Sequence, residues 1–156
     1  LRGLATQNVD GLHLVAGNSP DLVHEVHGTW RYTRCISCRD RLPVEYTLLR
    51  VEAGEADPQC LKCGGLMKRD VILFGEALVP DVIARAMAAA DEADLVMAIG
   101  TQLNVTPAAN VVTRGKASGA KVVIMNNQPT DRDRYADAFL MGDITEMLPA
   151  LVAIPD

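Results

Sequence analysis

The stretch Leu95-Val96-Met97-Ala98-Ile99-Gly100 decides the fold class of this chain. It is a short apolar run that lacks the alternation of a half-exposed strand, and it ends in a glycine. This pattern is typical of a strand that is buried on both faces of a parallel sheet. Two further runs have the same character, at residues 71–74 and 122–125. The sequence therefore predicts three strands of a parallel sheet.

The segments around these runs have helical patterns. Residues 80–93 place alanine and valine on one stripe, and residues 107–117 form a second helical segment. A third helix is expected to run toward Val152, because Asp143-Ile144-Thr145-Glu146 resembles a capping box. This alternation of strands and helices predicts an α/β fold with a Rossmann-like parallel sheet.

Length and composition exclude several classes of protein. A chain of 156 residues suits one compact domain, or one domain with a small insertion. The 15 Lys and Arg against 20 Asp and Glu argue against a nucleic-acid partner, and a hydrophobic content of 49% excludes a disordered chain. No apolar run is long enough to cross a bilayer, and no signal-like segment opens the chain. We therefore expect a cytoplasmic protein without a membrane partner.

The middle of the chain lacks the character of a parallel sheet. Residues 32–70 contain all four cysteines and a polar stretch at 52–58. We predict that residues 32–70 form a small zinc-ribbon-like module. This module is expected to be inserted between two parts of an incomplete Rossmann-like domain, residues 1–31 and 71–156.

The four cysteines form two CxxC pairs, Cys35 with Cys38 and Cys60 with Cys63, and 21 residues separate the pairs. Two such turns supply the tetrahedral set of four sulfurs that Zn²⁺ prefers. Two disulfides or a redox CxxC are the alternatives. Disulfides fit poorly with a cytosolic chain, and a redox motif does not explain a matched second pair. Because four cysteines leave no open coordination position, the predicted zinc is structural.

Polar residues follow the predicted strands at the point where each strand ends. The first strand, expected at residues 4–6, leads into the polar segment 6–13. The later runs lead into residues 100–103 and 126–128. Ligands of open α/β sheets bind outside the carboxyl ends of the strands, so these segments together indicate a nucleotide-sized ligand. The glycine-rich GxGxxG phosphate loop is not found in these residues.

Of the three histidines, His27 has the best case for chemistry. In an extended segment His24 and His27 lie on opposite faces, and from spacing alone either one is more often a structural residue whose hydrogen bonds are satisfied. Gly28 directly follows His27, and a glycine permits close approach of another backbone segment.

Short motifs then stand in a characteristic order along the chain. They are Thr6-Gln7-Asn8-Val9-Asp10-Gly11-Leu12-His13, His27-Gly28-Thr29, the two CxxC pairs followed by Gly64-Gly65, Phe74-Gly75-Glu76, Gly100-Thr101-Gln102-Leu103 with Pro107-Ala108-Ala109, Asn126, and Gly142-Asp143-Ile144. Together they resemble the sirtuins, a family of NAD-dependent protein lysine deacylases. The resemblance extends from Thr6 to Leu151.

The resemblance implies a role for each matching residue. It makes His27 the general base, with Asn8 and Asp10 as catalytic residues that position the reactants. It implies that NAD is bound by Gln7, Asn8, Val9, Asp10, Gly100, Thr101, Gln102, Asn126, Asn127, Gln128 and Ile144. It implies that the acyl-lysine substrate pairs by β-augmentation with a strand that contains Val71, Phe74, Gly75 and Glu76. The zinc of the family is structural, in agreement with the cysteine spacing.

The activity that the resemblance implies is deacylation of a lysine in a protein or peptide, with release of nicotinamide and O-acyl-ADP-ribose. The chain begins Leu1-Arg2-Gly3 without a methionine, and the family's first βα unit with its Gly-Ala-Gly loop is absent. We therefore expect a piece of a longer protein that is inactive by itself. Two alternatives stay open: a non-catalytic zinc-ribbon and nucleotide-binding interaction module, and a protein ADP-ribosyltransferase. The sequence does not indicate the oligomeric state.

Overall fold

The computed structural model describes residues 1–152, which fall into two compact units. One unit is Ala5–Val82, and the other combines Leu1–Leu4 with the chain from Ile83 onward. The predicted module 32–70 lies within the first unit, and its bounds as an insertion stay a prediction. Residues 153–156, which end the range predicted for the Rossmann-like domain, lie outside the described residues. None of the helices between residues 1 and 152 is long and apolar enough to cross a membrane.

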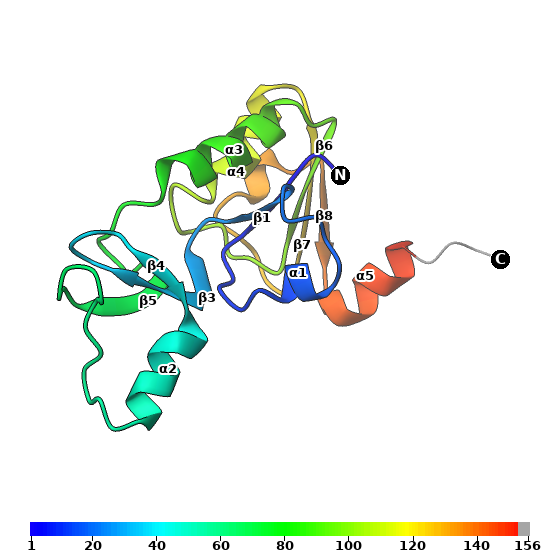
Figure 1. Cartoon of the computed structure of the whole chain (residues 1–156). Helices are drawn as coiled ribbons and strands as arrows, with labels where there is room; N and C mark the ends of the chain where they lie inside the picture. Colours follow the sequence, from blue (N-terminus) through cyan, green and yellow to red (C-terminus); the bar gives the residue numbers. More distant parts are fainter. Residues whose placement is uncertain (153–156) are drawn as a thin grey trace. The chain divides into compact units, whose positions relative to one another are not determined.

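A three-stranded parallel sheet forms the centre of the unit that begins at Ile83 (Figure 1). Its strands are β6 (Leu95–Ile99), β7 (Lys121–Asn126) and β8 (Ala138–Met141), in the order β6-β7-β8. Val96 is paired with Val122 in the parallel register. The predictions of strands at 95–99 and 122–125 and of an α/β fold with a parallel sheet are confirmed.

The three predicted helices lie close to their predicted positions, as α3 (Pro80–Asp91), α4 (Asn110–Ala117) and α5 (Ile144–Val152). The short 3-10 helix η1 (Asp133–Tyr135) was not predicted. Helix α3 ends two residues before the predicted end. Helix α4 begins three residues after its predicted start, because the backbone bond from Asn110 to Pro107 forms a turn there.

The core of this unit lies between the sheet and α4. Its buried residues are Ala98, Leu103, Ala109, Val112, Val122 and Ile124. Helix α4 approaches β6 closely, since a Cβ placed on Gly115 would lie only 2.5 Å from Cγ2 of Val96. Replacing the fully buried Ile124 with alanine is expected to cost about 2–5 kcal/mol of unfolding free energy.

The prediction of burial on both faces is correct for β7 and wrong for β6. In β7, Val122, Ile124 and Met125 are fully buried. In β6, Leu95 and Met97 are 49% and 41% exposed, whereas Ala98 is buried. The physical reason is that β6 forms the edge of the described sheet and packs one face against α4.

The unit Ala5–Val82 contains strands of two sheets. Strand β1 (Leu4–Thr6) pairs with β2 (Val23–Glu25), and the short helix α1 (Leu12–Val15) lies between them in the sequence. The expected strand at residues 4–6 is therefore confirmed. The N–H of Val26 continues the pairing by donating to the carbonyl of Thr6 at 3.0 Å.

The second sheet has three strands in the order β4-β3-β5 (Figure 1). It consists of β3 (Gly28–Cys35), β4 (Arg41–Pro43) and β5 (Met67–Val71), and helix α2 (Val44–Glu52) follows β4. Both outer strands run antiparallel to β3. A register shift interrupts the β3–β5 pairing after Gly28.

The prediction that residues 71–74 form a strand of the parallel sheet is wrong. Val71 is the last residue of β5, which pairs antiparallel with β3. Phe74 lies in a turn with its whole side chain exposed. The turn forms because the Glu76 carboxylate accepts a 2.8 Å hydrogen bond from the N–H of Leu73, so the chain leaves the strand direction.

Candidate functional site

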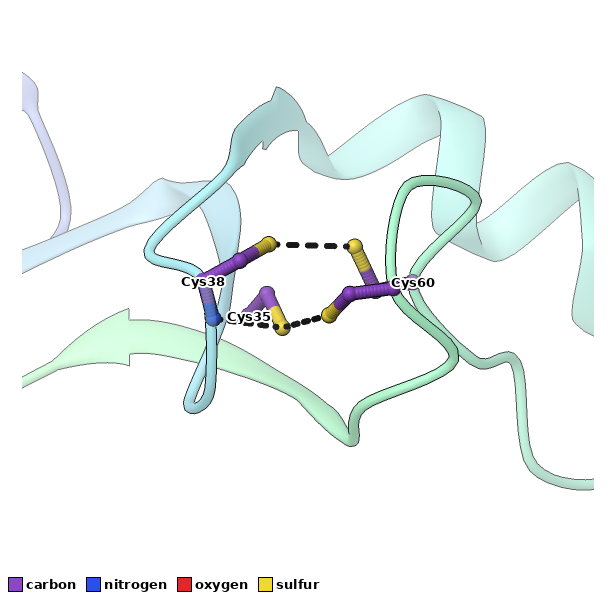
Figure 2. Close-up of side chains that lie close together, drawn as sticks. Cys35, Cys38 and Cys60 are labelled. Carbon is purple, nitrogen blue, oxygen red and sulfur yellow. Dashed lines mark hydrogen bonds between the residues drawn. The ribbon is translucent and has the colours of Figure 1, made fainter.

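The four cysteines converge in one cluster (Figure 2). Cys35 is the last residue of β3, and Cys38 lies in the turn that follows it. Cys60 and Cys63 lie in the turn that precedes β5. The four Sγ atoms all lie within 4.8 Å of one another. The cysteines are therefore positioned for a structural metal ion, as their spacing predicts.

The sulfur geometry fits a tetrahedral metal and not a pair of disulfides. The Sγ atoms of Cys35 and Cys63 are 3.5 Å apart, and those of Cys38 and Cys60 are 3.6 Å apart. A zinc ion with bonds of about 2.3 Å to sulfur places its ligands about 3.8 Å apart, whereas a disulfide requires about 2.05 Å. All four thiols are free. The disulfide alternative is therefore wrong in this structure.

The local backbone favours the thiolate form that a metal requires. The N–H of Cys38 donates to Sγ of Cys35 at 3.4 Å, and this is the largest of the contacts that lower the pKa of the Cys35 thiol to about 6. For Cys38 a backbone hydrogen bond from Asp40 also lowers the pKa, but the neighbouring cysteine sulfurs raise it by more, to about 12. Gly65 packs directly against the first CxxC turn. A Cβ at this position would lie 3.0 Å from Sγ of Cys35 and 2.6 Å from Oγ of Ser37, so the close packing requires glycine.

A cavity of about 310 Å³ lies in the unit that contains the parallel sheet. It is lined by Gly100, Gln102, Asn126, Asn127, Gly142, Asp143 and Ile144. These residues stand directly after β6, at the end of β7 and after β8. The carboxyl ends of three parallel strands thus meet at one cavity, which is the place where open α/β sheets bind ligands.

Three contacts fix the walls of this cavity. Gly100 has a φ of +62°, and its N–H donates to the carbonyl of Met125 at 2.9 Å. The side chain of Asn126, a residue only 5% exposed, donates from Nδ2 to the carbonyl of Gln128 at 2.8 Å. Oδ1 of Asp143 accepts from the N–H of Thr145 at 2.8 Å and caps α5. The hydrogen bonds from Thr145 also lower the pKa of the Asp143 carboxyl.

Most of the nucleotide residues predicted for this unit line the cavity. Gly100, Gln102, Asn126, Asn127 and Ile144 are among the lining residues, while Thr101 and Gln128 are adjacent in the sequence. Two lining residues, Gly142 and Asp143, are absent from the predicted site. The rule that singles out residues after a strand end also applies to them, because they follow β8 directly.

The segment between β1 and α1 holds the remaining residues predicted to bind NAD, Gln7, Asn8, Val9 and Asp10. The N–H of Asn8 donates to Oγ1 of Thr6 at 3.1 Å, and Oδ1 of Asp10 accepts from the N–H of Leu12 at 2.9 Å. The carbonyl of Val9 accepts from the N–H of Trp30 in β3 at 2.9 Å. The segment is therefore held in a defined conformation within the unit Ala5–Val82.

His27 lies in the turn between β2 and β3, and it is partly buried. Its carbonyl accepts a hydrogen bond from the N–H of Ile72 at 2.9 Å. Gly28 has a φ of +80°, and a Cβ there would lie 2.1 Å from the carbonyl oxygen of Asp70. Only glycine permits this approach, as its place after His27 suggests. The backbone of the predicted base is thus joined to the predicted substrate-binding segment.

That segment continues from Val71 into the turn Leu73–Glu76. The N–H of Glu76 donates to the carbonyl of Leu73 at 2.9 Å, and Gly75 adopts a φ of +89°. Nζ of Lys68 contacts both carboxylate oxygens of Glu76, at 2.6 and 2.5 Å. Hydrogen bonds from the Leu73 N–H and from Lys68 lower the pKa of the Glu76 carboxyl. The turn is fixed at both ends, with Phe74 at its tip.

One buried charge next to this segment is not indicated by any pattern in the sequence. Asp70 is only 7% exposed and contacts Arg34 and Arg41. Asp70 lies on β5, Arg34 on β3 and Arg41 on β4. Because the three residues lie on different strands, no local spacing in the sequence indicates that they meet.

Comparison with known proteins identifies relatives of this chain. The model of the Sir2 family matches residues 1–107. "NAD-dependent protein deacetylase 2" of Streptomyces coelicolor is 44% identical over 147 residues, which are 94% of this chain and 61% of that relative. "NAD-dependent protein deacetylase" of Sulfolobus acidocaldarius is 42% identical over 98% of this chain and 59% of its own length. The chain therefore spans about three-fifths of the length of the curated relatives it matches.

Solved structures agree with the sequence relatives. The solved structure "Sir2-p53 peptide-NAD+" superimposes with a TM-score of 0.87 at 31% identity. The match covers 96% of this chain and 61% of that chain. The described fold is therefore that of the Sir2 enzymes over nearly the whole chain.

Proposed function

This chain belongs to the Sir2 family, and on that premise we propose that the protein carrying it is an NAD-dependent protein lysine deacylase. The substrate is an acyl-lysine in a protein or peptide. One water is consumed, and the products are the free lysine, nicotinamide and O-acyl-ADP-ribose. The names of the relatives, and a similar structure described as a complex of Sir2 with a p53 peptide and NAD+, support this assignment.

The cavity at the strand ends would receive the adenosine half of NAD. Its volume lies at the lower end of the range of small-molecule sites. The amides of Gln102, Asn126 and Asn127 offer both donors and acceptors, which suit ribose hydroxyls and an adenine edge. Ile144 supplies an apolar surface for the base, and Thr101 and Gln128 complete the proposed set. Gln7, Asn8, Val9 and Asp10 stay in the proposed set of NAD-binding residues.

The chemistry needs no nucleophile from the protein. NAD supplies a ribose carbon that the acyl oxygen of the substrate attacks as nicotinamide leaves. His27 would then take a proton from a ribose hydroxyl, because an imidazole is the side chain best suited to accept a proton near neutral pH. The hydroxyl oxygen would attack the acyl carbon, and addition of water would release the lysine amine and leave the acyl group on the ribose. Asn8 and Asp10 would orient the reactants, and such positioning contributes a large part of many catalytic effects.

The observation that carries this proposal is the 2.9 Å hydrogen bond from the N–H of Ile72 to the carbonyl of His27. It joins the proposed base to the segment that would pair with substrate through Val71, Phe74, Gly75 and Glu76. A substrate strand added to this segment would hold its acyl-lysine at a fixed distance from the histidine.

Zinc would hold the module together without taking part in catalysis. The donor set of four thiols suits Zn²⁺, and four protein ligands leave no position for a substrate. A metal on Cys35, Cys38, Cys60 and Cys63 would fix the ends of β3 and β5, which carry His27 and the substrate segment on their other ends. The family relationship and the charge balance support a cytoplasmic enzyme that acts on proteins and does not bind nucleic acid directly.

One labelling experiment separates the candidate functions. The protein that carries this sequence is incubated with NAD labelled in the adenosine half and an acyl-lysine peptide. A deacylase moves the label into O-acyl-ADP-ribose and frees the lysine. An ADP-ribosyltransferase attaches the label to protein and leaves the peptide acylated. A non-catalytic interaction module leaves the NAD intact, and that result would refute the proposed enzyme.

A further inference from the structure

We propose that Asp70 is a positioning residue of the deacylation site, which holds the end of β5 against His27 and so orients the segment that binds the acyl-lysine peptide. This inference rests on the proposed function. Three sets of contacts support it: those of the Asp70 carboxylate with two arginines, those of the β5 backbone with His27 and Gly28, and those between the arginines and the cysteine module.

The Asp70 carboxylate contacts two guanidinium groups that lie on different strands. Nε and Nη2 of Arg34 on β3 contact Oδ1 and Oδ2 at 2.6 and 3.1 Å. Nε of Arg41 on β4 contacts Oδ2 at 2.5 Å. The Arg41 guanidinium in turn lies over the ring of Tyr32, 3.7 Å from its centroid. The three strands of the antiparallel sheet are thus joined at one carboxylate.

The Asp70 carboxylate is ionised and needs both partners. Its burial raises the pKa of the carboxyl, but the hydrogen bonds and charges of Arg34 and Arg41 lower it by more, so the pKa lies below its ordinary value. A buried charge that loses its partner is strongly unfavourable. The carboxylate therefore has one preferred position, unlike an exposed side chain that changes rotamer freely.

Backbone contacts couple the position of Asp70 to that of His27. The carbonyl oxygen of Asp70 occupies the space that a Cβ of Gly28 would need, at 2.1 Å. Two residues further along, the N–H of Ile72 donates to the carbonyl of His27 at 2.9 Å. A shift of the end of β5 would disturb this hydrogen bond and change where residues 71–76 present their backbone.

The metal module supports the same carboxylate. Arg34 directly precedes the metal ligand Cys35 in β3. Arg41 directly follows Asp40, whose carboxylate contacts Nζ of Lys62, inside the second CxxC pair, at 2.5 Å. Through Arg34 and Arg41, Asp70 therefore links the cysteine cluster to the proposed substrate segment.

The test compares Asp70→Asn with the wild type in steady-state deacylation. Asparagine keeps the shape of the side chain but loses the charge that holds the two arginines. A misplacement on the order of 1 Å can reduce a rate by about 100-fold. We expect kcat/KM for the peptide to fall by about 10- to 100-fold, with a raised KM for the peptide, an unchanged KM for NAD and unchanged zinc content.

Two further variants keep the test sharp if Asp70→Asn folds poorly. Arg41→Gln removes one partner and leaves the two contacts of Arg34, so an intermediate rise in the peptide KM is expected. Glu55→Gln is the matched control. It breaks the two hydrogen bonds of the Arg50–Glu55 ion pair in the same unit, at 2.7 and 2.6 Å, away from residues 70–76 in the sequence. We expect wild-type kinetics for Glu55→Gln.

A structural readout accompanies the kinetics. Hydrogen exchange of the Ile72 amide is expected to accelerate in Asp70→Asn, while exchange of the β7 amides stays at the wild-type rate. A variant that only unfolds a fraction of the molecules loses kcat and keeps its KM, which would overturn the inference. Wild-type kinetics in Asp70→Asn would overturn it as well. An inactive wild type is a different outcome, because it refutes the proposed function and this inference with it.

Discussion

The N–H of Ile72 donates a hydrogen bond to the carbonyl of His27 at 2.9 Å, so the turn after β2 and the end of β5 are joined by their main chains. Gly28 makes this contact possible, because any side chain at that position would collide with the carbonyl of Asp70. The proposed base and the proposed substrate segment are therefore joined through their backbones. Variants of these segments and of the two candidate sites have distinct expected effects.

Replacing His27 with alanine should abolish most of the deacylation. Loss of a general base reduces a rate by about 10²–10⁴-fold. The backbone bond to Ile72 does not need the imidazole, so zinc content and thermal melting should stay close to wild type. His13→Ala is the matched control, because it removes a histidine from helix α1. Wild-type turnover in His27→Ala, together with a loss in His13→Ala, would move the role of the base to His13.

Cys60→Ala should remove the metal and destabilise the unit Ala5–Val82. Three thiolates bind Zn²⁺ less tightly than four, and the short module has little apolar core of its own to replace the metal. Elemental analysis and thermal melting check this prediction. Lys62→Gln, inside the same CxxC pair, should keep one zinc per chain, because Lys62 is 70% exposed and supplies no sulfur ligand. Folded wild-type protein without zinc, purified without chelator, would refute the metal assignment.

Asn126→Ala should weaken NAD binding without affecting the peptide. The buried amide holds the carbonyl of Gln128 at 2.8 Å and lines the cavity at the end of β7. Its loss frees the following loop, and we expect the KM for NAD to rise by about tenfold, the usual effect of losing one good polar contact. Asn110→Ala, at the exposed start of α4, should leave both KM values unchanged. Equal effects of the two variants would argue against a nucleotide in this cavity.

Asp137 should make the parallel sheet sensitive to acid. Hydrogen bonds from Lys116 and from the N–H of Val122 lower the pKa of its carboxyl to about 2 from an ordinary value of 3.8. A lowered pKa stabilises the fold above pH 3.8, and this contribution is lost as the pH falls through about 2. Protection of the Val122 amide from hydrogen exchange should therefore decrease between about pH 5 and about pH 2. Asp137→Asn should show a smaller change over that range, and the exposed Asp131→Asn should behave as wild type.

Strong local patterns made part of the fold predictable. The runs at 95–99 and 122–125 are apolar and short, and both form strands of the parallel sheet. The run at 71–74 is equally apolar, yet its course is decided by distant residues. Gly28 admits the backbone of Asp70, and Lys68 with Glu76 closes the following turn. Pairing over such separations leaves no periodic signal in the sequence.

In the candidate site too, features set by local sequence were predictable and features set by distant contacts were not. The cysteine cluster follows directly from the CxxC spacing, because two short turns fix the positions of their own thiols. The carboxyl ends of the predicted strands identify most of the cavity, whereas Gly142 and Asp143 follow β8, a strand that was not predicted. Asp70 could not be found by either approach, since its partners Arg34 and Arg41 lie 36 and 29 residues away. Its burial is visible only in the folded chain.

Product stoichiometry shows most directly whether His27 serves a deacylation that consumes NAD. The protein that carries this sequence, and its His27→Ala variant, are incubated with NAD and an acyl-lysine peptide while nicotinamide and free lysine are quantified together. We predict one nicotinamide for each lysine that is freed, no nicotinamide without peptide, and a loss of freed lysine of about 10²–10⁴-fold in His27→Ala. Nicotinamide released while the peptide stays acylated, or equal yields from both proteins, would contradict the role proposed for His27.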